Sequence, residues 1–233
     1  MKIIVVGILL LHYSMIMYIK IFYFLFYFIF MINNFDLLEK WMENDERKNI
    51  FYHLQIVRRG KDHPDLPAAN QLLKSYVITS INHLERYKEE IIKLCEDFKC
   101  RAYLNIAPKD LRKLNELIIA NIANNLSNGN VRNPMRAIND VCGQLIPITK
   151  MWVIDIDKED LENLFTIEQT ISEIYGKRHG ERDWLYLKVN TNSGIHLITK
   201  PFNRAEFKKF YPKIDIHTNN PTLLYFPKSL SLC

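Results

Sequence analysis

The spacing of apolar residues divides the first half of the chain into helices and short strands. Helices are expected at 34–49, 81–98, 108–126 and 134–144. Strands are expected at 51–58, 74–79 and 101–106, where β-branched and aromatic residues gather. Two residues set expected helix starts: Ser80 is of a type that caps helix N-termini, and Pro108 is of a type that opens helices.

The second half predicts more strands than helices. The strands are expected at 151–156, 184–190, 195–199, 213–217 and 222–226, and the helices at 158–175 and 203–210. The connector TNSG joins two of these strands and has the length and chemistry of a tight turn. The pattern therefore predicts an α+β fold with a mixed, largely antiparallel sheet, an N-terminal αβ module and helices packed on the sheet.

Length and composition fit one large domain, or one domain with a short extension. The chain has 233 residues, of which 48% are hydrophobic and 24% are charged, so it can bury a sizeable core. We expect an αβ module at 31–150 and a sheet module at 151–233. The net charge of +5 is compatible with a polyanionic partner without requiring one. The four cysteines have no CxxC spacing, which favours reduced thiols in the cytoplasm over a zinc site.

The N-terminal segment differs from the rest of the chain. Residues 1–30 are almost wholly apolar, interrupted by Lys20, and the composition becomes charged and amphipathic soon after Met31. One interpretation is an over-extended start that precedes a protein beginning at Met31. The alternatives are a membrane anchor, which would give the protein a membrane partner, and a buried helix.

The first candidate site is the sequence VIDID. Side chains alternate along a strand, so Asp155 and Asp157 point to the same face, about 7 Å apart. Two carboxylates at that separation repel each other unless a cation lies between them, and Mg²⁺ or Mn²⁺ prefers such an oxygen-rich environment. The alternative is a strand end where two acids meet solvent.

Two further segments add polar residues to neighbouring strands. Ser193 and Gly194 lie in the predicted turn, and His196 begins the next strand, where it could bind a phosphate or a sugar. Asp215 is followed by an apolar residue and His217, which shares its strand face. Taken alone, each could be an ordinary strand residue. Together they supply the carboxylates and the phosphate-binding group that metal-dependent phosphoryl transfer needs.

The series apolar-apolar-Asp-x-Asp, Ser-Gly-x-His and apolar-Asp resembles the three motifs of the archaeo-eukaryotic primase superfamily, the primase-polymerases. The resemblance covers roughly residues 150–217 and implies an RRM-like catalytic core. It implies Asp155, Asp157 and Asp215 as catalytic metal ligands for Mg²⁺ or Mn²⁺. It implies Ser193, Gly194 and His196 as nucleotide contacts. The second motif is one or two residues shorter than the common Ser-Gly-x-Gly-x-His form, and no zinc-binding element is visible.

The function implied by this resemblance is nucleotidyl transfer with nucleoside triphosphates and a single-stranded nucleic acid template as partners. The series VIDID, SGIH and IDIH also resembles small proteins of phages and mobile elements. That resemblance implies phage replication proteins as further partners and the cytoplasm of the host cell as the location. The rival functions are a metal-dependent nuclease that uses the same acids and a non-catalytic nucleic-acid-binding accessory protein of a phage.

Basic residues provide secondary candidates. Lys200 follows His196 by four residues and could reach a triphosphate, and Arg58, Arg59 and Lys61 could hold a nucleic acid backbone from a loop. A second basic stretch, 177–182, precedes the strand at 184–190. The alternative for each is an ordinary solvated charge.

Overall fold

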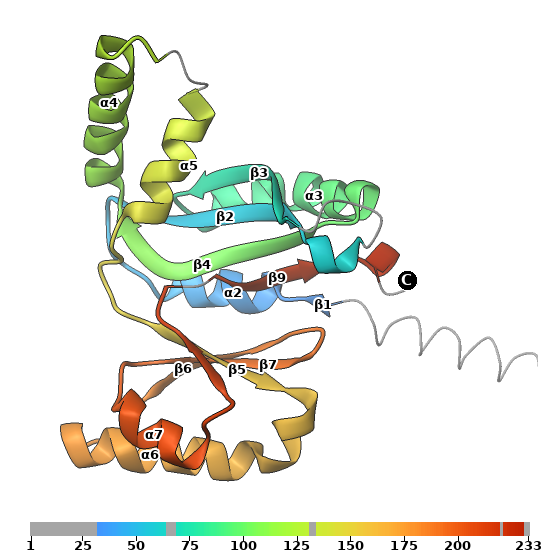
Figure 1. Cartoon of the computed structure of the whole chain (residues 1–233), viewed down its shortest axis with the longest axis vertical. Helices are drawn as coiled ribbons and strands as arrows, with labels where there is room; N and C mark the ends of the chain where they lie inside the picture. Colours follow the sequence, from blue (N-terminus) through green and yellow to red (C-terminus); the bar gives the residue numbers. More distant parts are fainter. Residues whose placement is uncertain (1–31, 64–68, 131–133, 220, 231–233) are drawn as a thin grey trace, which may run out of the picture.

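The computed structural model describes residues 32–63, 69–130, 134–219 and 221–230. Within these residues it is an α+β protein with two antiparallel sheets, of five and four strands, and six α-helices. The predicted α+β class is confirmed at this level. The larger sheet lies in the upper part of Figure 1 and the smaller sheet in the lower part.

The larger sheet has the order β1-β9-β4-β2-β3, with every neighbouring pair antiparallel. Its strands are β1 (Ile32–Asn33), β2 (Ile50–Arg58), β3 (Gln71–Ile78), β4 (Arg101–Asp110) and β9 (Thr222–Phe226). Alternate residues of β2, among them Leu54 and Ile56, are fully buried in a core that the helices α2 (Phe35–Glu43) and α3 (Ile81–Phe98) complete. The other face of β2 carries Gln55 and Val57 and remains partly exposed.

The smaller sheet has the order β6-β7-β5-β8 and is also antiparallel throughout. Its strands are β5 (Trp152–Asp157), β6 (Leu185–Asn190), β7 (Gly194–Thr199) and β8 (Asp215–His217). The helices α6 (Leu164–His179) and α7 (Arg204–Phe210) cover its outer face (Figure 1), where Ile154, Ile156 and Leu197 are fully buried. Along the chain the elements run β5, α6, β6, β7, α7, β8.

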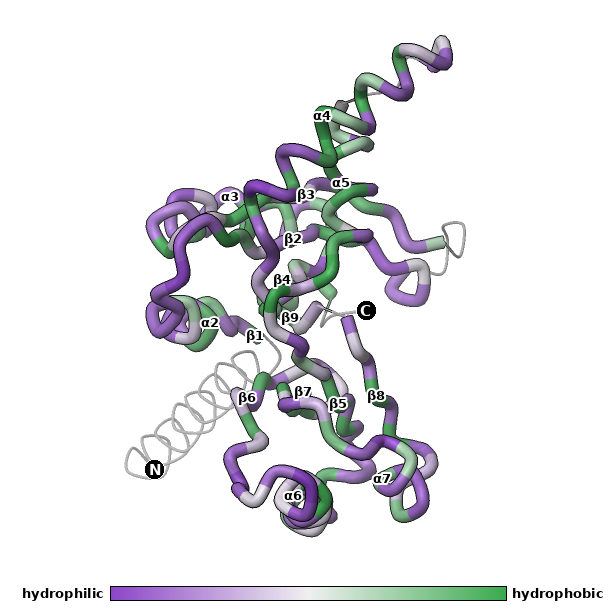
Figure 2. The backbone as a smooth tube through the Cα atoms, turned by 90° about the vertical axis from the view of Figure 1, so that its left-hand side faces the viewer, coloured by the Kyte–Doolittle hydropathy of each residue, from purple (hydrophilic) through white to green (hydrophobic). Residues whose placement is uncertain are grey.

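A pair of helices extends the larger sheet at one end. In both views α4 (Leu111–Ser127) projects away from the sheet, with α5 (Pro134–Gln144) beside it (Figures 1 and 2). The base of the pair packs on Phe51 of β2 through Leu114, Val141 and Leu145. These helices therefore cover only one end of the sheet face that carries Gln55.

Most predicted elements are confirmed, and several of their boundaries are wrong, among them three at helix ends. The helix predicted at 34–49 ends at Glu43, because the following NDERKN has no apolar residue to bury and Asn49 adopts a positive φ of 58°. Pro108 lies inside β4, beside a bulge in its pairing with β2, and the helix starts at Leu111 with Asp110 as its N-cap. The start of the helix predicted at 158–175 is the 3-10 helix η2 (Lys158–Asn163).

The C-terminal strand returns to the larger sheet. β9 pairs with β1 and β4, so the chain crosses from the smaller sheet back to the larger one after β8. The apolar segment at 1–30 lies outside the described residues. In the part of the chain that the structure describes, no helix combines the length and hydropathy needed to cross a lipid bilayer.

Candidate functional site between the two sheets

The strand register of the smaller sheet brings three of the predicted site residues into one row. Asp155 of β5 lies directly opposite His196 of β7 on one side and opposite Asp215 of β8 on the other. Residues directly opposite each other in a sheet point to the same face. The row therefore places two carboxylates and an imidazole side by side on the face that α6 and α7 do not cover.

This face borders a cleft of about 340 Å³ between the two sheets. The smaller sheet contributes Asp155, His196 and His217, and the larger sheet contributes Gln55 and Tyr103, with Arg59 just beyond the end of β2. The further lining residues are Val57, Asn70, Val153 and Pro221. The cleft is therefore polar on both walls, with one acid and two histidines facing a basic residue.

His196 is held by a hydrogen bond from the larger sheet. Its Nδ1 lies 2.9 Å from Oγ1 of the fully buried Thr222 in β9, and its Nε2 lies 3.5 Å from Asp155 Oδ1. Burial, with a contribution from the neighbouring His217, lowers the pKa of His196 to about 4, while Asp157 opposes the shift. At neutral pH the ring is therefore uncharged. In the tautomer that accepts the Thr222 hydroxyl proton at Nδ1, the ring proton lies on Nε2, which faces Asp155 and can donate a hydrogen bond.

Asp155 is the most constrained carboxylate of the row. Its Oδ1 atom is buried and has no hydrogen-bond partner among the described residues. Burial raises the pKa of Asp155, and the charge of Asp215 raises it further, whereas His217, Lys61 and Arg59 lower it. An unpartnered carboxylate oxygen beside a second carboxylate is a site that a cation would stabilise.

Asp157 and Asp215 are exposed, unlike the half-buried Asp155. Among the described residues, no group of three or more His, Cys, Asp and Glu side chains is gathered around one point as metal ligands. The backbone thus places the three acids on one sheet face, and the ligand set would be completed by rotation of the exposed side chains. The donor chemistry, which consists of carboxylate oxygens on a rigid sheet, fits Mg²⁺ or Mn²⁺.

Gly194 allows the β6–β7 hairpin to approach the end of β5 closely. A Cβ atom at this position would lie 1.9 Å from the carbonyl oxygen of Ile156, so only glycine fits. A hydrogen bond of 2.7 Å, from the backbone N–H of Lys158 to the carbonyl oxygen of Ser193, also joins this turn to the residue that follows β5. The Ser193 side chain is exposed in this turn. The close approach that the glycine permits is thus to the protein's own backbone, beside Asp157.

The structure separates the predicted basic cluster. Arg59 faces the cleft and donates a hydrogen bond of 3.2 Å to the Tyr103 hydroxyl, and Lys61 lies close enough to influence the charge of Asp155. Arg58, the last residue of β2, points the other way and donates to the carbonyl oxygen of Phe98 at the end of α3. The cleft therefore receives Arg59 without Arg58, and Lys61 lies outside its lining but near enough to lower the pKa of Asp155.

Lys200 lies beyond the other end of β7 from Gly194. Its ammonium group bonds Asp183 at 2.7 Å and lies over the rings of Tyr175 and Tyr186. It is not among the residues that line the cleft with His196. The structure thus gives Lys200 partners of its own, apart from the acidic row.

Several cleft residues, among them His217, Gln55 and Tyr103, were not selected from the sequence as site residues. His217 shares a strand face with Asp215, and that period-two spacing was the available signal. Gln55 and Tyr103 lie directly opposite each other on β2 and β4. No local motif marks them, because their role as cleft residues depends on how the two sheets meet.

Comparisons of this chain with known protein families, with curated proteins and with solved structures find no match. The case for a function therefore rests on the geometry of the site and on the sequence motifs.

Proposed function

We propose that this protein is a metal-dependent nucleotidyltransferase of the primase-polymerase type, acting on nucleoside triphosphates and nucleic acid. The observation that carries the proposal is the row of Asp215, Asp155 and His196 on three neighbouring strands, facing Arg59 across a cleft. Carboxylates opposed to a basic residue are the inventory that a metal–triphosphate complex requires.

The order of elements in the smaller sheet supports the same proposal. The sequence β5-α6-β6-β7-α7-β8, with the spatial order β6-β7-β5-β8, has the β-α-β-β-α-β arrangement of an RRM-like core. In this arrangement the two middle strands are β5 and β7, which carry Asp155 and His196. An RRM-like core with acids on its open face is what the resemblance to the primase-polymerases implies.

The acids would hold the metal ions. Asp155 and Asp215 are adjacent across the sheet, and Asp157 extends the site toward the hairpin turn at Gly194. A bound divalent ion supplies Lewis-acid stabilisation of charge on the reacting phosphate. The contribution of the chain itself is to fix these carboxylates on neighbouring strands, so that little reorganisation accompanies the reaction.

The remaining cleft residues would orient the phosphates. Neutral His196 offers its Nε2 proton as a hydrogen-bond donor, with the ring held in place by Thr222. Arg59 supplies positive charge from the opposite wall, and Lys61 adds charge from nearby. A guanidinium group binds two phosphate oxygens at once, so Arg59 suits the triphosphate better than a lone ammonium group would.

The test measures binding of a labelled nucleoside triphosphate to the full chain as Mn²⁺ is titrated. The wild-type protein should bind in a metal-dependent manner, and Asp155→Asn/Asp157→Asn should weaken binding at least about tenfold because the ligand set is lost. The matched control is Asp97→Asn/Glu89→Gln, which removes two exposed acids from α3. Equal affinity of the site variant and the wild type would contradict the proposal, as would metal-dependent degradation of nucleic acid without triphosphate binding.

A further inference from the structure

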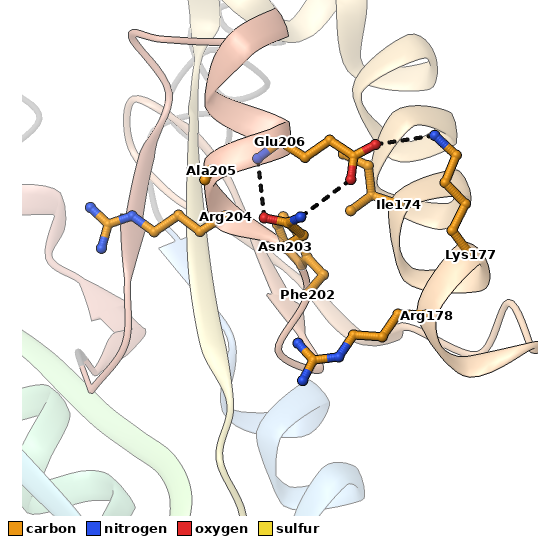
Figure 3. Close-up of a pocket in the computed structure, with 8 residues that line it drawn as sticks. All are labelled: Ile174, Lys177, Arg178, Phe202, Asn203, Arg204, Ala205 and Glu206. Carbon is orange, nitrogen blue, oxygen red and sulfur yellow. Dashed lines mark hydrogen bonds and ion pairs between the residues drawn. The ribbon is translucent and has the colours of Figure 1, made fainter.

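A second polar hollow lies on the other side of the smaller sheet, between the C-terminal part of α6 and the start of α7 (Figure 3). Its volume is about 650 Å³. Phe202 and Ile174, both buried, contribute its apolar part, and Lys177, Arg178 and Arg204 supply three cations. None of these residues belongs to the cleft that contains Asp155.

The charges of this hollow are unevenly paired. Glu206 is its acidic member, and its carboxylate bonds Lys177 at 3.1 Å and Asn203 Nδ2 at 3.4 Å. In Figure 3, Arg178 and Arg204 extend away from this carboxylate. Both side chains are exposed, and neither forms an ion pair or a hydrogen bond in the described part of the chain. Two guanidinium groups at the rim of the hollow therefore have no acid partner among the described residues, and that of Arg204 extends away from the other lining residues (Figure 3).

Helix stabilisation explains only part of this charge. Lys177 and Arg178 lie in the last turn of α6, where cations interact favourably with the helix dipole. Arg204 is the first residue of α7, where the dipole disfavours a cation. A requirement of the fold therefore does not account for Arg204, whereas an external anion would. Arg182 is a further exposed cation. Its side chain lies close to Gly176 of α6, beside Lys177.

We propose that this hollow, defined by Lys177, Arg178, Phe202, Asn203 and Arg204, is a second phosphate-binding surface that holds the backbone of a nucleic acid outside the cleft. Exposed guanidinium groups bind phosphodiesters in a bidentate manner, and two of them on different helices can contact separate phosphates. The choice of nucleic acid over another polyanion rests on the proposed function, which gives this chain a polynucleotide to hold.

The test measures the affinity of the full chain for a fluorescent single-stranded oligonucleotide in the presence of EDTA, at several salt concentrations. Arg178→Ala/Arg204→Ala should weaken binding by about tenfold at low salt and reduce the slope of log affinity against log salt by about two, since two phosphate contacts are lost. The matched control is Arg86→Ala/Lys93→Ala, which removes two exposed cations from α3. The control should leave both the affinity and the slope near their wild-type values.

The proposal is overturned by no change in the hollow variant or by an equal loss in both variants. It is also overturned if polyglutamate binds with the same affinity and the same sensitivity to Arg178→Ala/Arg204→Ala. Competition with inorganic phosphate and with a nucleoside triphosphate separates the sources of phosphate. Weak competition by both compounds supports a polynucleotide as the ligand. Displacement of the oligonucleotide by either compound at equal phosphate concentration overturns the proposal. Because EDTA removes metal ions, this outcome is independent of the metal-dependent triphosphate binding that tests the proposed function.

Discussion

The two faces of the smaller sheet are built from the same strands but differ in burial and in polarity. On the outer face, Ile154, Ile156 and Leu197 are fully buried against α6 and α7. On the inner face, the intervening residues Asp155 and His196 meet a cleft and have pKa values displaced by their surroundings. Because strand side chains alternate, one residue packs against the helices and the next one along the strand faces the cleft.

This alternation explains how a sheet can hold two acids side by side. Like charges directly opposite each other on neighbouring strands are destabilising, and Asp155 and Asp215 are such a pair. The buried outer face supplies the hydrophobic stabilisation that offsets this repulsion. The comparison predicts that substitutions on the outer face change the free energy of unfolding, whereas substitutions on the inner face change ligand binding.

The largest effect is expected for Ile154→Ala on the outer face. Ile154 is fully buried, and removing its side chain leaves a cavity beneath α6, so the free energy of unfolding should fall by about 3 kcal/mol. Chemical denaturation monitored by tryptophan fluorescence measures this change. The paired variant is Asp155→Asn, one residue along. It should leave stability unchanged or raise it slightly at neutral pH, since burial and Asp215 already disfavour the charged carboxylate.

Similar losses of stability for Ile154→Ala and Asp155→Asn would contradict the expected difference between the outer and the inner face. Such a result would mean that Asp155 is held by an interaction that stabilises its charged form. Greater stability of Asp155→Asn alone would support that difference, because it would show that the wild-type carboxylate lowers the stability of the fold.

The next effect is expected at Gly194, where the inner-face row meets the hairpin turn. In Gly194→Ala the new Cβ would overlap the carbonyl oxygen of Ile156, so β5 and β7 must separate near Asp157. We expect a loss of about 2 kcal/mol in the free energy of unfolding and weaker metal-dependent triphosphate binding. Gly129→Ala is a control, since nothing lies within 4 Å of its Cβ position, although its φ of 69° makes that substitution strained as well. If Gly194→Ala is less destabilising than Gly129→Ala, the close approach is not what constrains this position.

The candidate site was partly readable from the sequence because the acids and His196 follow local rules. The period of a strand places Asp155 and Asp157 on one face, and the turn chemistry of TNSG locates Gly194. Their assembly into a row depends on the register of β5 with β7 and β8, which the sequence motifs imply without determining. The opposing wall, with Gln55 and Tyr103, depends on contacts between two sheets and leaves no local signal.

The fold shows the same division between local and non-local information. Amphipathic spacing and the Ser80 cap gave α3 its correct ends, because both are local. Pro108 was wrongly taken as a helix start, since its place in β4 is made possible by a bulge against β2. The membership of β9 in the larger sheet is set by pairing with β4, a contact between distant parts of the chain.

A smaller effect is expected from His53, which belongs to the larger sheet and lies on the same face of β2 as Gln55. Burial lowers the pKa of His53 to about 4, and the charge of Lys109 adds to this shift. Between pH 6.5 and pH 4 the unfolded chain therefore binds more protons than the folded one, so stability falls as the pH is lowered through this window. The expected loss between pH 7 and pH 5.5 is about 1 kcal/mol, measured by denaturation at each pH.

His53→Gln should make that dependence shallower and leave the part that His196 contributes, and His179→Gln, which replaces an exposed histidine in the last turn of α6, should leave it intact. An unchanged slope in His53→Gln would show that the polar face of the larger sheet does not limit stability in acid. The comparison would then apply to the smaller sheet alone.

The smallest expected effect tests the link between the two sheets at Thr222. Its hydroxyl bonds Nδ1 of His196, and Thr222→Val keeps the shape of the side chain while removing that bond. The free energy of unfolding should fall by about 1 kcal/mol. Triphosphate affinity should fall by a larger factor than this loss of stability implies, because the ring loses the partner that fixes its tautomer.

Titration of labelled triphosphate with Mn²⁺ measures the affinity, and His196→Gln gives the reference for complete loss of the imidazole. Wild-type affinity in Thr222→Val, with reduced affinity in His196→Gln, would mean that the imidazole acts without the orientation that β9 provides.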